Sequence, residues 1–378
     1  MVGNRHSARL RGAISGKDKT DVVDAEVLSR TADVFTRRRL VPPSPDQLAL
    51  RRACRRRHKV LVDHNRVYRR LLSLARWAAF PDVWIAFAGS RATAVAVLTG
   101  WPHLEALSRA QLPTVTDVVA AHTRRVGDVG RRAAAIRDAA RGWARFWRDR
   151  LDLDGLAFEV TELLSDLTEG AHRLARTDEE ARRLWERAWG DDPLVLSLPG
   201  VGPRIAPTIR AFLADGTMFT AGSQVAAYVG LAPSTLSSGT VTQPSRAITK
   251  EGPAELRLAF YQAANVARTI DPQLASFYRR LMVERGHCHS QANTAVARKL
   301  ATRTWATLTS KRPYELRDLE GRPVTRSHAK QLAASLAVPE AVRRRTRARS
   351  AATRRGVSPA EPAASSLRPD PTRASNRR

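Results

Sequence analysis

Two long stretches of this sequence carry apolar residues at the spacing of an α-helix. In residues 46–77 the positions recur at alternating steps of four and three, and residues 77–190 continue the pattern in their second half. Such spacing puts side chains on one face of a helix, and its length indicates a helical hairpin or coiled coil. The chain is therefore predicted to be mainly α. The positions are Val60, His64, Val67, Leu71 and Leu74, followed by Leu156, Val160, Leu163, Leu167, Ala171 and Leu174.

Arginine dominates the charge of the chain. The 378 residues include 64 Lys and Arg against 36 Asp and Glu, a net charge of +28, and only seven of the 64 are lysines. This excess favours a polyanionic partner, although a solvated basic surface or a codon bias toward arginine would leave the same composition. Two cysteines, Cys54 and Cys288, exclude a disulfide scaffold. Without a predicted signal peptide or membrane span, we expect a cytoplasmic protein that binds nucleic acid.

Composition divides the chain into four segments, with residues 1–76 and 77–190 predicted to be helix-rich. Residues 191–326 contain more glycine and proline, in short apolar pieces between turns. Between Val342 and Arg378, eleven arginines stand against two acidic residues. Such a composition cannot bury enough surface to fold, so we predict a disordered basic tail at residues 327–378.

A glycine-rich turn lies within residues 196–213. An apolar helix end, the sequence Pro-Gly-Val-Gly with Gly200 and Gly202, and a second apolar helix are typical of a helix-hairpin-helix. The glycines expose backbone N–H groups that can bind a DNA phosphate without reading sequence, and Arg204 and Arg210 would add positive charge. The alternative is an ordinary connector between two helices.

A second candidate site lies within residues 228–264. Ser237 and Ser238 stand before a glycine in a loop rich in Gly, Pro and Ser, and Lys250 and Arg257 follow near the start of the next helix. A serine hydroxyl beside cations could attack a phosphodiester, while the two cations neutralise the developing charge. On composition alone, however, a Ser-Gly pair more often forms a turn.

Six sequence motifs, taken in order, resemble those of one group of bacterial transposases. They are KDKTDVVDAEVLSR, LVPPSPDQLALRRACRRRHKVLVDHNR, GLAPSTLSSG, ITKEG, AELRLAFYQAA and ANTAVARKLATRTWATL. Their order and spacing resemble those of the motifs in the DEDD insertion-sequence transposases. These transposases are related to Piv-type DNA invertases and are described as bridge-RNA-guided recombinases. The resemblance covers roughly residues 10–320.

The resemblance implies an RNase-H-like (RuvC-like) domain with four acidic metal ligands, and a C-terminal domain with a nucleophilic serine. The last two acids of that set match Asp21 and Asp24, and the serine matches Ser238, with Ser237 as the neighbouring alternative. The resemblance therefore implies Mg²⁺ as cofactor. It also implies DNA cleavage and joining through a phosphoserine intermediate. Without the family, Asp21 and Asp24 would be interpreted as acids favoured at a helix N-terminus.

The first two acids of the family have no counterpart, because only twenty residues precede Asp21 and their one acid, Asp18, stands in the wrong place. We therefore expect a truncated first domain in residues 1–76, a partial RuvC-like α/β remnant with too few carboxylates for two metals. The alternative function is a catalytically inactive DNA- and RNA-binding remnant. A third possibility is an active enzyme, whose missing acids come from a separately encoded N-terminal fragment or from sequence upstream of a misassigned start codon. The implied partners are insertion-sequence ends, target DNA, a guide RNA and further copies of the chain, at the bacterial nucleoid and without a membrane.

Other residue types that often carry chemistry are predicted to be structural here. Adjacent residues cannot chelate a metal ion as spaced ligands do. The sequence around Tyr228 and Tyr261 lacks the Arg/His set of a tyrosine recombinase. The predictions are a surface turn at His287, Cys288 and His289, a packed His64, and core aromatic residues at Tyr228, Tyr261, Trp143 and Trp147.

Overall fold

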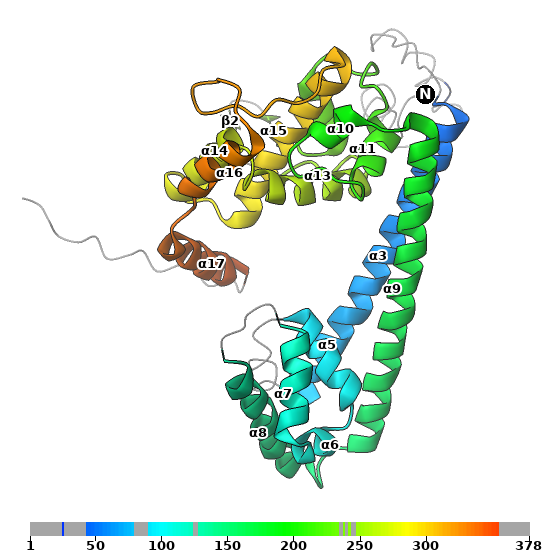
Figure 1. Cartoon of the computed structure of the whole chain (residues 1–378), viewed down its shortest axis with the longest axis vertical. Helices are drawn as coiled ribbons and strands as arrows, with labels where there is room; N and C mark the ends of the chain where they lie inside the picture. Colours follow the sequence, from blue (N-terminus) through cyan, green and yellow to red (C-terminus); the bar gives the residue numbers. More distant parts are fainter. Residues whose placement is uncertain are drawn as a thin grey trace, which may run out of the picture. The chain divides into compact units, whose positions relative to one another are not determined.

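The computed structural model (Figure 1) describes Ala25 and residues 43–78, 90–123, 128–233, 237–238, 241–242 and 247–354. Within these ranges the chain is mainly helical, as predicted, and its strands form a single antiparallel pair. None of the described helices is long and apolar enough to cross a membrane. The RuvC-like remnant predicted for residues 1–76 falls largely on residues outside the described ranges, so it stays a prediction.

The chain forms two compact units. Unit 1 comprises Met1–Leu48, Pro193–Val201 and Phe212–Arg378, and unit 2 comprises Ala49–Asp192 and Gly202–Ala211. Helix α11 (Ala206–Leu213) and the first residues of α3 cross the division. The helices of unit 2 are α3 (Pro45–Ala78), α5 (Arg91–Gly100), α6 (Leu104–Arg109), α7 (Leu112–Ala121), α8 (Val129–Trp147) and α9 (Leu153–Trp189).

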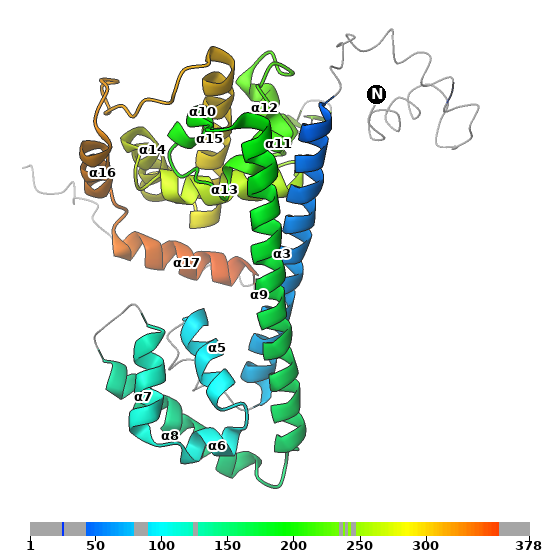
Figure 2. The ribbon, with the colours of Figure 1, turned by 45° about the vertical axis from the view of Figure 1, so that its right-hand side comes forward.

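Helices α3 and α9 of unit 2 run side by side in opposite directions (Figures 1 and 2). The Arg57 guanidinium pairs with the carboxylate of Asp178, whereas Arg70, further along α3, pairs at 3.1 Å with Glu159, which lies earlier on α9. Residue numbers therefore rise along one helix as they fall along the other. The two long helices predicted from the sequence, α3 and α9, thus pack against each other in an antiparallel pair, although they are distant in sequence.

The apolar seam between these helices follows the predicted spacing, with one shift. Leu71 on α3 and Leu163 on α9 are buried, while Ala171 is exposed. The seam instead passes through Gly170, where an added Cβ would stand 2.8 Å from Nδ1 of His64. The imidazole of His64 is packed, as predicted, and its Nε2 accepts a hydrogen bond from Arg91 at 2.7 Å.

Helices α5 to α8 fold onto the seam and share one hydrophobic core with it. The indole rings of Trp143 and Trp147 stack at 6.4 Å and pack, partly buried, against that core. The prediction that these tryptophans pack in the core is confirmed. Fully buried members of the core include Val97, Leu98, Leu104, Leu107, Val115, Ile136 and Val160.

Unit 1 is built around the long helix α15 (His289–Ser310), which packs against α10, α12, α13, α14 and α17. Small residues such as Ala297 and Ala301 line its buried faces and let several helices approach it. The other elements are α10 (Pro193–Ser197), α12 (Gly222–Val229), β1 (Ser237–Ser238), β2 (Val241–Thr242), α13 (Ala254–Ala267), α14 (Pro272–Val283), α16 (Arg326–Ser335) and α17 (Glu340–Arg354).

The predicted disordered tail is wrong for residues 327–354, which form α16 and α17. Ala329 and Ala333 of α16 are buried, as is Val338 in the connection to α17. These three apolar side chains help to dock the segment, and an average over the whole composition does not reveal them. Residues 355–378 lie outside the described ranges.

Candidate catalytic loop and nucleic-acid interface

The loop that carries Ser238 leaves and re-enters unit 1 at one place. The Thr249 N–H donates to the carbonyl of Ala232 at 2.9 Å, and the Lys250 N–H donates to the carbonyl of Gly230 at 3.1 Å. An isolated bridge also joins Pro233 to Ile248. These bonds close the base of the loop, which we call the serine loop (residues 230–252).

Further out, the serine loop forms the antiparallel pair of β1 and β2. Ser237 is the partner of Thr242, and Ser238 is the partner of Val241. The backbone of Ser238 is thus the end of a short hairpin strand. The side chains of both serines lie outside the described part of the chain, so their assignment as nucleophile stays a prediction.

Two glycines allow the arms of the serine loop to approach each other. An added Cβ on Gly252 would stand 1.7 Å from the carbonyl oxygen of Tyr228. Gly230 has a φ of +74°, and its Cβ would stand 2.8 Å from the guanidinium of Arg257. Both positions therefore require glycine, one for space and the other also for its left-handed conformation.

Arg257, at the start of α13, connects the two arms through their backbone. Its Nη1 donates to the carbonyl of Val229 at 3.2 Å and to the carbonyl of Gly252 at 3.3 Å. Burial lowers the pKa of the Arg257 guanidinium. These bonds give Arg257 a positioning role at the base of the loop, and the charge neutralisation expected from the sequence stays a prediction.

Lys250, in contrast, presents an exposed side chain at the base of the serine loop. Its backbone has a φ of +54°, a left-handed conformation that costs a residue with a Cβ roughly 1–2 kcal/mol. Lysine is an unfavourable choice for such a backbone, and strained residues of this kind cluster at functional sites. The cation of Lys250 therefore remains a candidate for contact with phosphate.

The two glycines of the Pro-Gly-Val-Gly turn have different surroundings. Gly200 has a φ of +77°, and a Cβ there would stand 2.1 Å from the carbonyl oxygen of Ala263 on α13. Around Gly202 an added Cβ would meet no atom within 4 Å. Gly200 is thus required by packing, whereas the space where a Cβ of Gly202 would stand is open, and its contact with a phosphate stays a prediction.

Arg210 is engaged inside unit 2. Its Nε and Nη2 donate to the two carboxylate oxygens of Asp192 at 2.5 and 2.6 Å, and both side chains are buried. The indole of Trp185 donates to the same carboxylate at 3.4 Å. The expectation that Arg210 supports a bound phosphate is therefore wrong.

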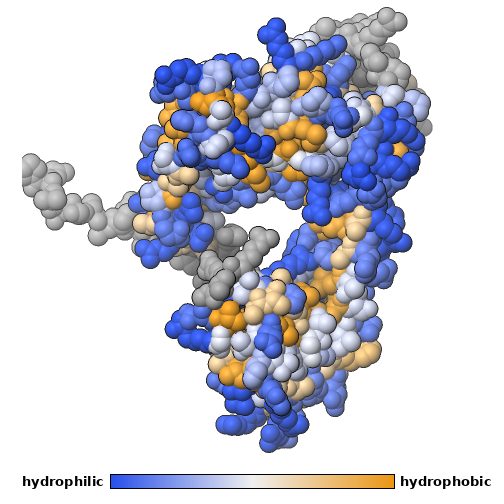
Figure 3. Space-filling view, viewed as in Figure 1, coloured by the Kyte–Doolittle hydropathy of each residue, from blue (hydrophilic) through white to orange (hydrophobic). Residues whose placement is uncertain are grey.

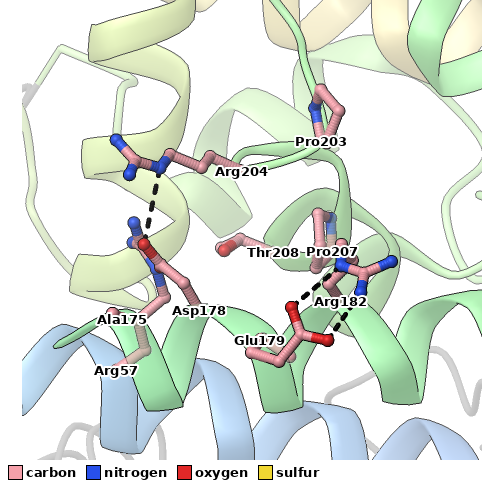
Figure 4. Close-up of a pocket in the computed structure, with 10 residues that line it drawn as sticks. Arg57, Ala175, Asp178, Glu179, Arg182, Pro203, Arg204, Pro207 and Thr208 are labelled. Carbon is pink, nitrogen blue, oxygen red and sulfur yellow. Dashed lines mark hydrogen bonds and ion pairs between the residues drawn. The ribbon is translucent and has the colours of Figure 1, made fainter. Parts of the chain in front are cut away.

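Arg204 borders a cavity of about 250 Å³ in unit 2 (Figure 4). Asp178 lies at its edge and pairs with Arg57 through one oxygen and with Arg204 at 3.4 Å through the other. Arg182 is held by Glu179 and by Glu186. Because the Arg204 side chain is 81% exposed, it is the lining arginine best able to turn toward a phosphate.

Within the described ranges, no group of three or more His, Cys, Asp or Glu side chains could hold a metal ion. The predicted ligands Asp21 and Asp24 lie outside those ranges, so their role remains a prediction. Cys288 is the N-cap of α15, and the neighbouring His289 accepts or donates a 2.8 Å bond with the Tyr278 hydroxyl. His287 and Cys288 thus lie in the connection before α15, and His289 is the first residue of that helix.

Tyr228 and Tyr261, predicted to be core aromatics, are both half-buried. The ring of Tyr228 lies 5.2 Å from that of Phe219, and the backbone carbonyl of Tyr261 accepts a bond from Asn293. Both residues therefore belong to the packing of unit 1.

Comparison with known proteins identifies the class. Residues 192–279, which include the glycine turn, the serine loop and α13, match the model of the transposase IS116/IS110/IS902 family. The chain is 30% identical over 327 residues to an IS116 insertion-element protein of Streptomyces clavuligerus, a match covering 83% of this chain and 77% of that protein. These matches place the chain in the class of insertion-element transposases. The chain belongs to the IS116/IS110/IS902 family.

Two other relatives are matched over shorter regions. An IS110 insertion-element protein of Streptomyces coelicolor is 34% identical over 158 residues, or 42% of this chain and 38% of that protein. A pilin gene-inverting protein of Moraxella lacunata is 32% identical over 125 residues, or 33% of this chain and 38% of that protein. The chain thus covers less than two thirds of both of these relatives.

Proposed function

We propose that this chain is a DNA transposase or recombinase that cleaves and joins DNA strands with Ser238 as its nucleophile. The observation that carries the proposal is the closed base of the serine loop, where the two arms of the segment that contains β1 meet beside the exposed Lys250. Membership of the transposase family and similarity to a protein named for inverting a pilin gene support the same activity.

In the proposed reaction the Ser238 oxygen attacks a DNA phosphorus and displaces a sugar hydroxyl. The serine loses its proton and the leaving sugar oxygen gains one. A phosphoester bond to serine forms as the bond between phosphorus and the sugar oxygen breaks. A hydroxyl of a second strand then displaces the serine and restores the DNA backbone. Mg²⁺ held by Asp21 and Asp24 would supply stabilisation of phosphoryl charge.

We further propose that the chain assembles as a homo-oligomer on insertion-sequence ends and target DNA, with a structured guide RNA. Figure 3 shows hydrophilic residues over most of the face in view, and the chain as a whole carries a net charge of +28. Arginine contacts to phosphates do not depend on base sequence, so such surfaces suit both kinds of nucleic acid.

Replacing Ser238 with alanine is expected to abolish strand transfer, because the hydroxyl that would form the bond to phosphorus is lost. The assay contains purified chain, DNA with the insertion-sequence ends, target DNA, Mg²⁺ and RNA transcribed from the element. Joined DNA and a covalent protein–DNA adduct are measured on denaturing gels. Ser237→Ala removes the neighbouring hydroxyl and serves as the matched control, with both products retained.

Loss of both products in Ser237→Ala but not in Ser238→Ala would move the nucleophile to Ser237. Equal activity of both variants would refute serine catalysis by this loop. DNA and RNA binding by the wild-type chain without any joined product would instead identify a binding protein without cleavage activity.

Lys250→Gly is expected to weaken DNA binding without lowering the thermal unfolding temperature. Glycine relieves the left-handed backbone and removes only the exposed cation. Lys250→Asn, which also tolerates this conformation, should behave in the same way. The measurements are thermal unfolding and equilibrium binding to duplex DNA. Unchanged affinity in both variants would show that Lys250 does not contact phosphate.

A further inference from the structure

Helix α17 adds a group of arginines to unit 1, and part of its surface is docked. Thr346 is buried, and α17 packs against α14 and α15. Arg349 donates to the carbonyl of Gly286, and Arg279 donates at 2.8 Å to the carbonyl of Ala337, just before α17. These contacts fix which side of α17 faces the rest of unit 1.

Two arginines of α17 converge with a third from the end of α13. Tyr278 on α14 and His289 at the start of α15 share a 2.8 Å hydrogen bond, and α17 packs against both of these helices. Burial lowers the pKa of His289, and the positive charges of Arg268, Arg347 and Arg343 lower it further. Arg343 and Arg347 are one helical turn apart and share a face of α17. The guanidinium of Arg268 lies 4.5 Å over the ring of Tyr278.

The positive charge of this group is poorly balanced. Arg343 and Arg347 both have their closest carboxylate, Glu340, at 3.9 Å, and the two side chains are 39% and 74% exposed. Ion pairs of that length at an exposed surface contribute little. Arg268 donates to the neutral side chain of Asn265 at 2.9 Å. Among the described residues, these three cations thus have one nearby carboxylate at an open surface.

We propose that Arg268, Arg343 and Arg347 form a binding surface for the phosphodiester backbone of nucleic acid. We call it the α17 arginine surface. It extends from α13 to α17, which suits a polymer of regularly spaced charges better than a single small anion. Guanidinium groups bind phosphate oxygens through paired N–H donors. The inference rests on the proposed function, since it names a surface by which a transposase holds its nucleic acid.

The test compares two double variants on the same helix. Arg343→Gln with Arg347→Gln removes two cations of the surface, whereas Arg344→Gln with Arg345→Gln removes two other exposed cations of α17 that do not belong to the group. Both change the charge equally and keep good helix formers. The full-length chains are titrated against duplex DNA and against a structured RNA between about 50 and 200 mM salt. Circular dichroism and thermal unfolding check that each variant is folded.

For the first pair, we expect the slope of log affinity against log salt to become shallower by about 0.9 for each lost phosphate contact on duplex DNA. The control pair should keep a slope close to that of the wild type. Arg343→Lys with Arg347→Lys should restore most of the slope, because the charge returns. If the slope changes for only one of the two nucleic acids, that nucleic acid is the one that binds to the α17 arginine surface.

Equal slopes for the two glutamine pairs on both nucleic acids would overturn the proposal, because the arginines would then act only through net charge. This outcome is separate from the fate of the proposed function. Strand transfer that depends on Ser238, together with unchanged slopes, would refute the α17 arginine surface alone. A specific change of slope without any strand transfer would refute the catalytic proposal alone.

Discussion

Gly200→Ala is expected to destabilise unit 1 by about 2–5 kcal/mol. The left-handed backbone at a φ of +77° costs a residue with a Cβ roughly 1–2 kcal/mol. The new methyl group would also stand 2.1 Å from the carbonyl oxygen of Ala263, so α13 would have to move, at a further cost of roughly 1–3 kcal/mol. Urea unfolding gives the total loss, and amide hydrogen exchange of α13 shows where it arises.

Gly202→Ala is the matched control, because it adds the same methyl group two residues away where no atom lies within 4 Å. Its stability should stay within about 0.5 kcal/mol of the wild type. If Gly202 contributes the open backbone that a phosphate approaches, this variant should lose DNA affinity while remaining folded. Equal destabilisation by the two substitutions would contradict the packing role assigned to Gly200.

The faces of the long helices could be predicted because burial repeats with the period of the helix itself. Leu71 and Leu163 lie on the seam for that reason. The partner of α9 could not be predicted, since periodicity shows which face is buried and not what covers it. The local shift from Ala171 to Gly170 has the same origin, because it depends on the ring of His64 from the opposite helix.

The order of motifs predicted which residues form the candidate site, but not how the site is held. Arg257 donates to the carbonyl groups of Val229 and Gly252. A backbone carbonyl has the same chemistry at every residue, so no side-chain pattern reveals such a contact. The glycine at position 230 did give a signal, since a glycine directly after a helix often adopts a left-handed cap.

Asp192 was missed for a different reason. Its partner Arg210 stands in α11 among buried residues such as Ile209 and Phe212. An arginine within so apolar a segment needs a carboxylate to balance its charge, which was a usable signal in the sequence. The acid lies 18 positions away, however, and only the folded chain brings the two together.

Asp192→Ala is expected to destabilise unit 2 by about 3–5 kcal/mol, because it leaves the buried guanidinium of Arg210 without its carboxylate. The same substitution removes the acceptor of the Trp185 indole. Urea unfolding followed by tryptophan fluorescence measures the loss, since Trp185 is buried beside the altered residue. Asp191→Ala, which removes an exposed carboxylate at the adjacent position, should change stability by less than about 0.5 kcal/mol.

A double variant distinguishes the loss of a charge pair from the loss of packing. Asp192→Leu with Arg210→Met replaces both charges with apolar groups, so no unpaired ion remains inside unit 2, and most of the stability should return. Its cost should therefore be smaller than that of Asp192→Ala alone, giving a large coupling energy between the two positions. Additive losses would show that the two side chains do not form the buried pair. Recovery of stability together with unchanged DNA binding would confirm that Arg210 stabilises the fold without contacting nucleic acid.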